Sequence, residues 1–426
     1  MTRKLLTEEL PGTGGIFKAA AEDFQVEEIP CYLPSGVGEH LFIEVEKRNL
    51  TTLDLVRQLA RQCGVRERDI GYAGLKDARG VTRQWLSLPA SEAGGKIAAE
   101  NGRFRILTIR RHRNKLRLGH LRGNRFRIRI RNTKTGALEL ATAILRELEQ
   151  KGVPNTFGPQ RYGALGNSSE IGGALLREDF EGAVRELLGP PERIRDPRWR
   201  QGAQRFAEGD LEGALGVLPQ ACHHERRIVQ ALLAGRSHRQ ALLALPQRLL
   251  RLYLAAYQSE LFDRIVALRL PELGTLWPGD LAMKHSNGAC FSVPDPEREQ
   301  ARADVFEISP SGPLFGCKVL LATDQAGELE QRLLAERGLR LEAFSLPGGL
   351  RLEGCRRPLR VPVAEPEVRE EGEDLLLSFI LPAGSYASSV MSEIMKNGGE
   401  DPGRELVPET DANPLENGVD SDFCLC

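Results

Sequence analysis

In the first third of the chain, apolar residues recur with two different periods, that of a strand and that of a helix. Residues 24–29, 40–45 and 81–88 alternate roughly between apolar and polar side chains, which predicts strands. Residues 126–131 alternate without a break, which predicts a strand with one apolar and one cationic face. Residues 52–63 repeat apolar side chains at helical spacing, with Thr51 or Thr52 as N-cap and Gly64 at the end. A second helix is predicted over residues 138–151, stopped by Gly152 with Pro154 beyond it.

The middle of the chain has a different character. Helical periodicity predicts helices over residues 180–188, 210–218 and 246–269, followed by short strands around 279–293. Pro347-Gly348-Gly349 marks an exit from this region. Apolar alternation returns at residues 350–363 and 375–381, and residues 385–396 read as a helix. Strands before and after a helical middle predict an α+β core that is interrupted by an inserted domain.

The predicted domains are therefore a core in two parts, residues 1–155 and 349–396, around an insert, residues 156–348. Residues 397–426 are acidic, rich in Pro, Gly and Asn and poor in apolar side chains, so this tail is expected to be disordered. At 426 residues the chain exceeds the usual size of a single core, which agrees with more than one domain.

Charge is distributed unevenly along the chain. The formal net charge is −1, yet no acidic residue lies between Glu100 and Glu139, where arginines and lysines are dense. A solvated basic face is the plain interpretation, but such faces usually carry interspersed acids. An acid-free basic block instead favours contact with nucleic-acid phosphates. Within it, Gly119 and Gly123 allow close backbone approach, and Phe126 could stack on a base or simply belong to the core.

Several classes of protein lack support in this sequence. The eight cysteines are scattered, so we expect reduced thiols in a cytoplasmic protein, and the sequence Cys222-His223-His224 lacks metal-site spacing. No apolar run is long enough for a transmembrane helix. A phosphate-binding GxxxxGK[ST] loop is missing, and the glycines at 12–15 lack the context of a dinucleotide site. We therefore expect no membrane association, metal, nucleotide or other cofactor.

One short segment, GYAGLKDARGVTRQWLS at residues 71–87, carries the main candidate for chemistry. Read alone, Lys76 to Gly80 is a turn, because Asp tolerates turn geometry and Gly supplies a positive φ. The segment after it is a predicted strand, so Asp77 lies in a loop that enters a strand, where scaffolds often present functional groups. A solvated turn remains the alternative.

The chain resembles the TruD family of tRNA pseudouridine synthases. The resemblance rests on pieces that occur in the family's order. They are GTGGIFKAAAEDFQVEE, GEHLFIEVEK, GYAGLKDARGVTRQWLS, RHRNKLRLGHLRGNRFRI, GVPNTFGPQRYG and LPAGSYASSVMSEIMK. Together they cover residues 12 to 396, with the insert less distinctive, and the tail lies outside them. The resemblance implies the pseudouridine-synthase fold, a mixed to antiparallel sheet core with an inserted, partly helical α+β domain, and the isomerisation of uridine 13 in the D arm of tRNA.

The resemblance also implies site residues. It makes Asp77 the catalytic aspartate with Lys76 beside it, and it gives active-site positions to Lys18 and Phe24. It matches Asn124 and Phe126 to a Gly-Asn-x-Phe element, with the aromatic ring expected under the target base. It also implies Arg161 as a substrate-binding position. The basic block itself supplies Arg113, Lys115, Arg117 and Arg122 as candidates for binding RNA phosphates. Gly80 departs from the bulkier residue expected in this loop, which predicts a less rigid loop.

The reaction breaks the N1–C1′ bond of a uridine and joins C5 to C1′, which requires a flipped-out base and a carboxylate. Asp77 could add to C1′, add to C6 or remove a proton from C2′, and the sequence leaves all three open. A neighbouring cation, Lys18 or Lys76, would keep Asp77 ionised. Two other functions were weighed: a non-catalytic RNA-binding or ribosome-assembly factor, and a glycoside hydrolase, which would need a second carboxylate. A monomer that binds tRNA is expected.

Overall fold

The computed structural model describes residues 4–93, 100 and 102–397, and these form two compact units. The first unit comprises residues 4–153 and 361–397, and the second comprises residues 154–360. The second boundary was predicted at residues 348/349 but lies at 360/361. The reason is that β14 (Cys355–Pro358) pairs with β11 (Ile308–Leu314) inside the second unit. Apart from Asn397, the tail predicted to be disordered lies outside the described residues.

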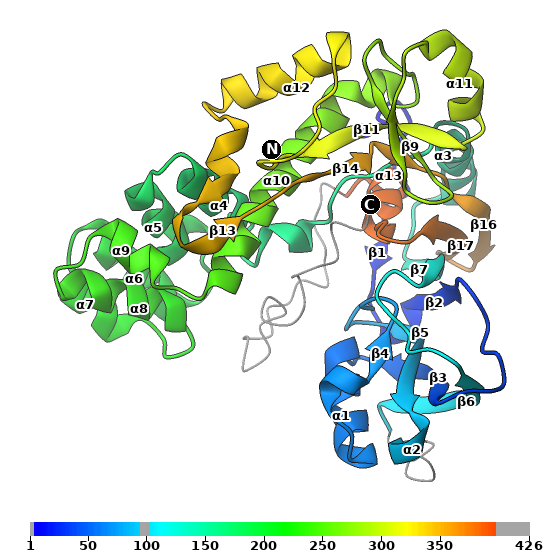
Figure 1. Ribbon diagram of the computed structural model, residues 1–426, viewed down its shortest axis with the longest axis horizontal. Helices are drawn as coiled ribbons and strands as arrows, with labels where there is room; N and C mark the ends of the chain where they lie inside the picture. Colours follow the sequence, from blue (N-terminus) through cyan, green and yellow to red (C-terminus); the bar gives the residue numbers. More distant parts are fainter. Residues whose placement is uncertain (1–3, 94–99, 101, 398–426) are drawn as a thin grey trace. The chain divides into compact units, whose positions relative to one another are not determined.

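The first unit is built on a nine-stranded sheet in the order β16-β17-β7-β2-β5-β3-β6, with β1 beside β7 and β4 beside β5 (Figure 1). Its strands are β1 (Ile16–Phe17), β2 (Phe24–Pro30), β3 (His40–Arg48), β4 (Gly71–Tyr72), β5 (Val81–Pro89), β6 (Phe104–His112), β7 (Leu121–Arg131), β16 (Ala364–Glu371) and β17 (Asp374–Pro382). β2 and β5 run parallel, whereas the other neighbours are antiparallel. The mixed α+β fold is therefore confirmed.

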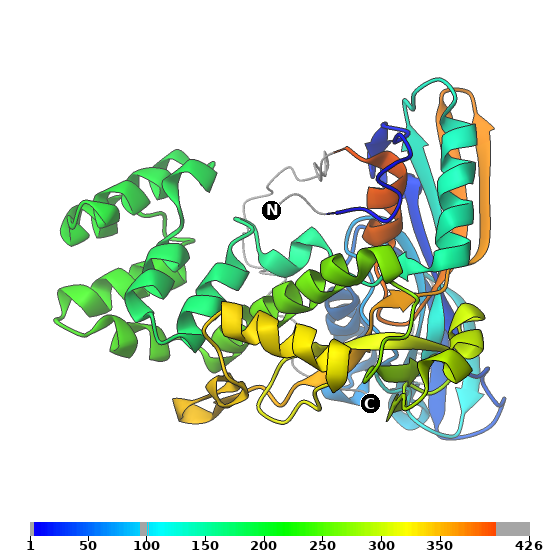
Figure 2. The same cartoon turned by 90° about the horizontal axis from the view of Figure 1, so that it is seen from above.

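Helices cover this sheet and supply two apolar cores. The helical elements of the unit are η1 (Ala21–Asp23), α1 (Thr52–Cys63), η2 (Glu67–Asp69), α2 (Ala90–Ala93), α3 (Ala137–Lys151) and α13 (Ala387–Met395). Buried residues of α3 and α13 pack with β2, β7 and β17 in one core, and Figure 2 shows these two helices side by side against the sheet. Buried residues of α1 pack with β3, β5 and β6 in the other.

Local sequence signals account for most of these boundaries. α1 begins at Thr52 because the Thr51 hydroxyl accepts the Asp54 N–H, and it ends at Gly64, which has a φ of 71°. The predicted strands over residues 24–29, 40–45, 81–88 and 126–131 are confirmed. The segment 350–363 differs, since it forms three short strands, β13 (Leu350–Arg351), β14 and β15 (Arg360–Val361), rather than one.

The second unit combines helices with a small antiparallel sheet in the order β10-β9-β11-β14. Its helices are η3 (Pro159–Tyr162), α4 (Ser168–Leu176), α5 (Phe180–Leu188), η4 (Pro191–Arg193), α6 (Pro197–Ala207), α7 (Leu211–Val217), α8 (His223–Leu233), α9 (His238–Leu243), α10 (Gln247–Arg269), η5 (Leu270–Glu272), α11 (Pro296–Asp304), α12 (Asp324–Glu336), η6 (Leu341–Phe344) and η7 (Pro347–Gly349). Its remaining strands are β9 (Leu281–Lys284), β10 (Cys290–Ser292) and β12 (Ser345–Leu346), and β8 (Val153–Pro154) lies where the chain enters it. The long helix α10 packs along α4 and against β11.

The three helices predicted in this region are confirmed as α5, α7 and α10. In the part of the chain that the structure describes, none of the helices combines the length and the apolar character that crossing a membrane requires.

Candidate active site

The topology of the first unit brings two distant loops to one edge of the sheet. β2 and β5 are parallel, and Gln25 faces Val81 in their register. Strands of a parallel pair begin at the same edge, so the chain entering β2 meets the chain entering β5. The first of these segments carries Lys18, and the second carries Asp77. Residues far apart in sequence are therefore neighbours because of one strand pairing.

Asp77 and Lys18 form the charged pair at this edge. Lys18 Nζ lies 4.0 Å from Asp77 Oδ1, and the two side chains are 13% and 38% exposed. Lys18 has a φ of 58°, a left-handed conformation that is uncommon for a residue with a side chain. Its ammonium lies 3.9 Å from the centre of the Phe24 ring, a cation–π contact that helps to hold it beside Asp77. Asp77 is thus a half-exposed carboxylate with an adjacent, largely buried cation.

Two buried lysines, Lys76 and Lys47, stabilise the loop that carries Asp77. Lys76 Nζ lies 2.7 Å from Glu28 Oε2, and both side chains are almost fully buried. Lys47 is also buried, and its Nζ donates to the backbone carbonyls of Asp77, at 2.9 Å, and of Leu50. Burial lowers the pKa of the Lys47 ammonium to about 8, although the nearby Asp77 charge opposes this shift. The peptide on either side of Asp77 is therefore fixed by buried charge.

Gly80 stands at a closely packed position of this loop, where the sequence departs from the bulkier residue expected. Its φ is 132°, and a Cβ built there would lie 2.5 Å from the carbonyl oxygen of Phe24. The Gly80 N–H donates to Asn49 Oδ1 at 3.1 Å, and the Asn49 N–H donates to the Gly80 carbonyl at 3.0 Å. Only glycine permits both the conformation and the close approach to β2.

The aromatic residues at the site belong to the core. Phe24 and Phe126 are 2% and 4% exposed, and their ring centres lie 6.1 Å apart. The Phe126 ring also packs 5.5 Å from Phe379. In this structure Phe126 therefore has little free ring face and forms part of the apolar wall.

Asn124 lies near this wall on β7. It faces Glu28 across the β2–β7 pair, so both side chains project from one side of the sheet. Asn124 Oδ1 is buried, and the described residues supply no hydrogen-bond partner for it. A buried acceptor without a partner costs free energy, which makes Asn124 a candidate for binding a ligand.

The basic block contains no acidic residue in sequence, but in the structure carboxylates from other segments lie beside it. On β7, alternate arginines reach carboxylates on neighbouring strands or on the turn before β2. The pairs are Arg125 with Glu365, Arg127 with Glu27, Arg129 with Glu371 and Asp374, and Arg131 with Asp23. The interpretation of this strand as a free cationic face is corrected accordingly, because most of its charge is balanced within the sheet.

The connection between β6 and β7 differs from the strand. It carries three of the predicted RNA-binding cations, Arg113, Lys115 and Arg117, and the fourth, Arg122, follows at the start of β7. Within residues 4–93, 100 and 102–397, no carboxylate forms an ion pair with any of them, although Lys115 donates to the Arg68 carbonyl. The Gly119 N–H donates to the Ala73 carbonyl at 2.8 Å, which ties this connection to the segment leading to Asp77. Part of the positive charge of the block that forms no ion pair therefore lies on this connection.

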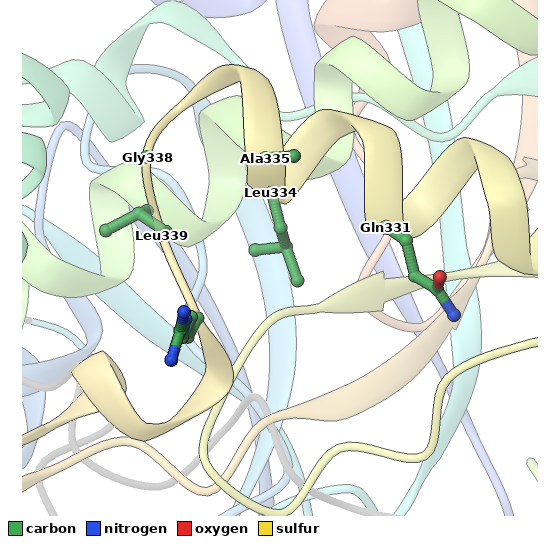
Figure 3. A pocket seen from close by; sticks show the side chains of 6 residues that line it. Gln331, Leu334, Ala335, Gly338 and Leu339 are labelled. Atoms are coloured by element: carbon green, nitrogen blue, oxygen red, sulfur yellow. The ribbon is translucent and has the colours of Figure 1, made fainter.

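Arg161 belongs to the second unit, on η3. Its guanidinium donates to Ser259 Oγ at 2.9 Å and to the Ala255 carbonyl at 3.3 Å, both on α10. The second unit also has an open hollow of about 480 Å³ at the end of α12 (Figure 3). Its lining consists of Gln331, Leu334, Ala335, Gly338, Leu339 and Arg340. With no carboxylate in this lining, the hollow offers no group for acid–base chemistry.

Two residues of this edge were missed from the sequence. Glu28 stands at a polar position inside a predicted strand and Lys47 just beyond one, which resembles ordinary surface alternation. Their burial depends on the loop that folds over them, so the strand pattern alone gave no signal. A weak signal was available for Glu28, because it closes the quoted segment AAAEDFQVEE.

Comparison with known proteins adds a family relationship. The model of the TruD family, tRNA pseudouridine synthase D, matches residues 1–394. The protein named tRNA pseudouridine synthase D from Syntrophotalea carbinolica is 53% identical, and the match covers 92% of this chain and 98% of that protein. The protein of the same name from Geobacter metallireducens is 51% identical, over 94% and 99% of the two chains. That from Thermus thermophilus is 41% identical, over 92% and 91%.

A solved structure agrees with this relationship. A crystal structure from Methanosarcina mazei, whose description names tRNA pseudouridine synthase D, superposes with a TM-score of 0.79 at 28% identity. The superposition covers 93% of this chain and 96% of the other. The similarity in sequence and in fold thus extends over nearly the whole chain.

Proposed function

Since this chain belongs to the TruD family of tRNA pseudouridine synthases, we propose that it isomerises uridine 13 in the D arm of tRNA, with Asp77 as the catalytic carboxylate. The observation that supports this assignment most is the distance of 4.0 Å between Asp77 Oδ1 and Lys18 Nζ. The loop that carries Asp77 is held by the hydrogen bond from Lys47 Nζ to the Asp77 carbonyl. The position within tRNA follows from the resemblance alone. No second substrate is consumed, because the reaction rearranges bonds within one nucleotide.

The chemistry requires that the N1–C1′ bond breaks, that C5 joins C1′ and that the C5 proton leaves. An ionised Asp77 can take part by adding to C1′, by adding to C6 or by removing the C2′ proton. Each route begins with the charged carboxylate, and the Lys18 ammonium lies 4.0 Å from it. The carboxylate remains accessible to a base that has left the helical stack, since its side chain is 38% exposed.

The neighbouring residues have separate proposed roles. Asn124 supplies its buried Oδ1 as an acceptor for a donor group on the uracil edge. Phe126 and Phe24 form the apolar wall behind the base rather than a free stacking surface, because both rings are nearly buried. Lys76 acts through its ion pair with Glu28, which fixes the peptide next to Asp77. Lys76 is thus a positioning residue.

RNA binding is assigned to the connection between β6 and β7 more than to β7 itself. The cations Arg113, Lys115 and Arg117 of this connection, with Arg122 at the start of β7, form no ion pair with a carboxylate of the described residues, so they can neutralise phosphates and release counterions. Arg161 contributes from the second unit. The protein acts as a monomer in this proposal, because one chain carries the carboxylate, the cations and the insert.

The test is tritium release from a tRNA transcript labelled at C5 of uridine, with pseudouridine mapped by carbodiimide treatment and reverse transcription. Wild-type protein is expected to release tritium without any added cofactor, with a stop at position 13. Asp77→Asn is expected to abolish release while tRNA binding is retained, because the amide cannot replace an ionised carboxylate. Asp69→Asn is the control for loss of a carboxylate outside the loop of Asp77, since Asp69 pairs with Arg66 and has Lys115 nearby.

Two results would contradict the proposal in different ways. Turnover by Asp77→Asn would remove Asp77 from the mechanism. Absence of turnover by wild-type protein on several transcripts, together with tight binding, would favour the RNA-binding or assembly factor. A glycoside hydrolase would need a second carboxylate beside Asp77, and it would release no tritium from C5 of uridine.

A further inference from the structure

A small aromatic cluster stands at the surface of the first unit, in the loop between β2 and β3. The Tyr32 ring is stacked on His112, with ring centres 5.2 Å apart and planes inclined by 17°. His120 contacts Tyr32 edge-on at 5.6 Å, and its Nδ1 lies 2.6 Å from the Tyr32 hydroxyl. Beneath them His112 packs 4.5 Å from Phe42, which is buried. The stack therefore extends from the core to the surface.

This cluster is built to stay in place. The Ser35 N–H donates to His112 Nδ1 at 3.1 Å, which fixes the orientation of the imidazole. Burial lowers the pKa of His112, with His40 and Arg113 contributing, so the ring is neutral at physiological pH. Phe42 packs with Ala73 and Leu116 in a small apolar cluster, and Ala73 lies on the segment leading to Asp77. The surface stack is thus continuous with the scaffold of the candidate active site.

Part of the Tyr32 ring, the outermost ring of the cluster, is exposed to solvent. Tyr32 remains 36% exposed although His112 covers one face. The neighbouring Leu33 is 74% exposed, so the loop does not fold back over the ring. An exposed, rigid aromatic face is a surface on which an unpaired nucleobase can stack.

The charges around this surface favour a polyanion. Arg117 is close enough to influence Tyr32 electrostatically, and His112 and His120 flank the basic connection that carries Arg113. Arg111 donates to the Gly38 carbonyl in the same loop, at 3.0 Å. Aromatic rings among cations without carboxylate partners are the usual composition of a surface that binds single-stranded RNA.

We propose that Tyr32, supported by His112 and His120, is a stacking site for an unpaired base of the tRNA other than the target uridine. The proposal rests on the proposed function, because it takes tRNA as the substrate. It adds a second contact outside the loop of Asp77, which would fix the register of the RNA. Its contribution is to binding and not to the chemical step.

The test compares the affinity of Tyr32 variants for fluorescent tRNA by anisotropy over a series of salt concentrations. Tyr32→Leu is expected to raise Kd roughly 5- to 100-fold, the loss of one stacked base, without changing the slope of log Kd against log salt. Tyr32→Phe retains the ring and should bind within about 2-fold of wild type, since a stacked base contacts the ring and not the hydroxyl. Leu33→Ala is the matched control, because Leu33 is more exposed but not aromatic.

Kinetics separate this proposal from the assignment of Asp77. With saturating tRNA, Tyr32→Leu should keep the wild-type kcat and show only a raised KM. A Kd equal to that of wild type for Tyr32→Leu would overturn the stacking site even if the protein is an active isomerase. Conversely, the difference in Kd can be measured even if no pseudouridine is formed.

A second measurement does not depend on folding of the variant. Wild-type protein is irradiated with a transcript containing 4-thiouridine, and the cross-linked peptides are identified by mass spectrometry. Cross-links at Tyr32, His112 or His120 would support the proposal. Cross-links confined to other peptides, or a wild-type protein that does not bind the transcript, would overturn it.

Discussion

The buried ion pair of Lys76 and Glu28 allows a quantitative test of how the loop of Asp77 is held. Lys76 Nζ and Glu28 Oε2 are 2.7 Å apart, and the two side chains are only 4% and 1% exposed. The Trp85 N–H also donates to Glu28, at 3.3 Å. Glu28→Gln keeps the shape but removes the negative charge, which leaves a buried ammonium without its counterion. Breaking a buried pair in this way costs about 3–5 kcal/mol.

The assay is urea unfolding followed by tryptophan fluorescence. Of the three tryptophans, Trp85 lies in the first unit, whereas Trp199 and Trp277 lie in the second. A background with Trp199→Phe and Trp277→Phe therefore reports unfolding of the unit that contains the ion pair. Glu147→Gln in the same background is the control, because its pair with Lys151 on α3 is exposed, with 39% and 56% of the side chains accessible. An exposed helical pair of this kind contributes only about 0.3–0.5 kcal/mol.

The comparison can refute the reasoning directly. If Glu28→Gln lowers the free energy of unfolding by no more than Glu147→Gln does, the pair is not the buried anchor described above. A double variant, Glu28→Leu with Lys76→Met, provides the complementary result. Because it removes both charges and fills the space with apolar groups, it should recover most of the lost stability. A double variant as unstable as Glu28→Gln would attribute the loss to packing and not to charge.

Three further predictions follow from the charges and the backbone of the same unit. Arg117→Gln should lower the slope of log Kd for tRNA against log salt by about 1, whereas Arg125→Gln should leave it nearly unchanged because Glu365 already neutralises Arg125. Lys47 has a folded pKa of about 8, below its ordinary value of 10.5, so the unfolded chain binds more protons between these values. Wild-type stability should therefore rise from pH 8 to 10.5 relative to Lys47→Met, by up to about 3 kcal/mol in urea titrations. Gly80→Ala should destabilise the first unit by at least about 1 kcal/mol and reduce tritium release, because its Cβ meets β2 at a positive φ; unchanged melting and turnover would refute this.

Much of the local structure could be read from the sequence because its causes are local. The N-cap of α1 at Thr51 and its end at Gly64 depend on a few adjacent residues; the end was predicted, and Thr51 was one of two predicted caps. The apolar alternation at residues 126–131 likewise identified the buried face of β7. Asp77 was singled out from a motif, and the half-exposed loop in which it lies agrees with that choice.

The charge balance of the site could not be read in this way. Between Glu100 and Glu139 the sequence has thirteen lysines and arginines and no acidic residue. In the structure, however, four arginines of β7 pair with carboxylates from β2, β16, β17 and the turn before β2. Such pairs depend on which strands become neighbours, and strand order is a non-local property. The same reason hid Lys47 and Glu28, which look like surface residues until a loop buries them.

The sequence by itself determined the periodicity of the elements, several helix boundaries and the family resemblance, and from that resemblance came the proposal of Asp77. Only the tertiary structure decided which cations remain available to RNA and which groups hold Asp77. The parallel pairing of β2 with β5 joins the segments of Lys18 and Asp77, which are separated by a long stretch of chain. The physical reason is that helix caps and apolar periodicity depend on a few adjacent residues, whereas strand pairing, burial and ion pairing depend on the packing of the whole unit.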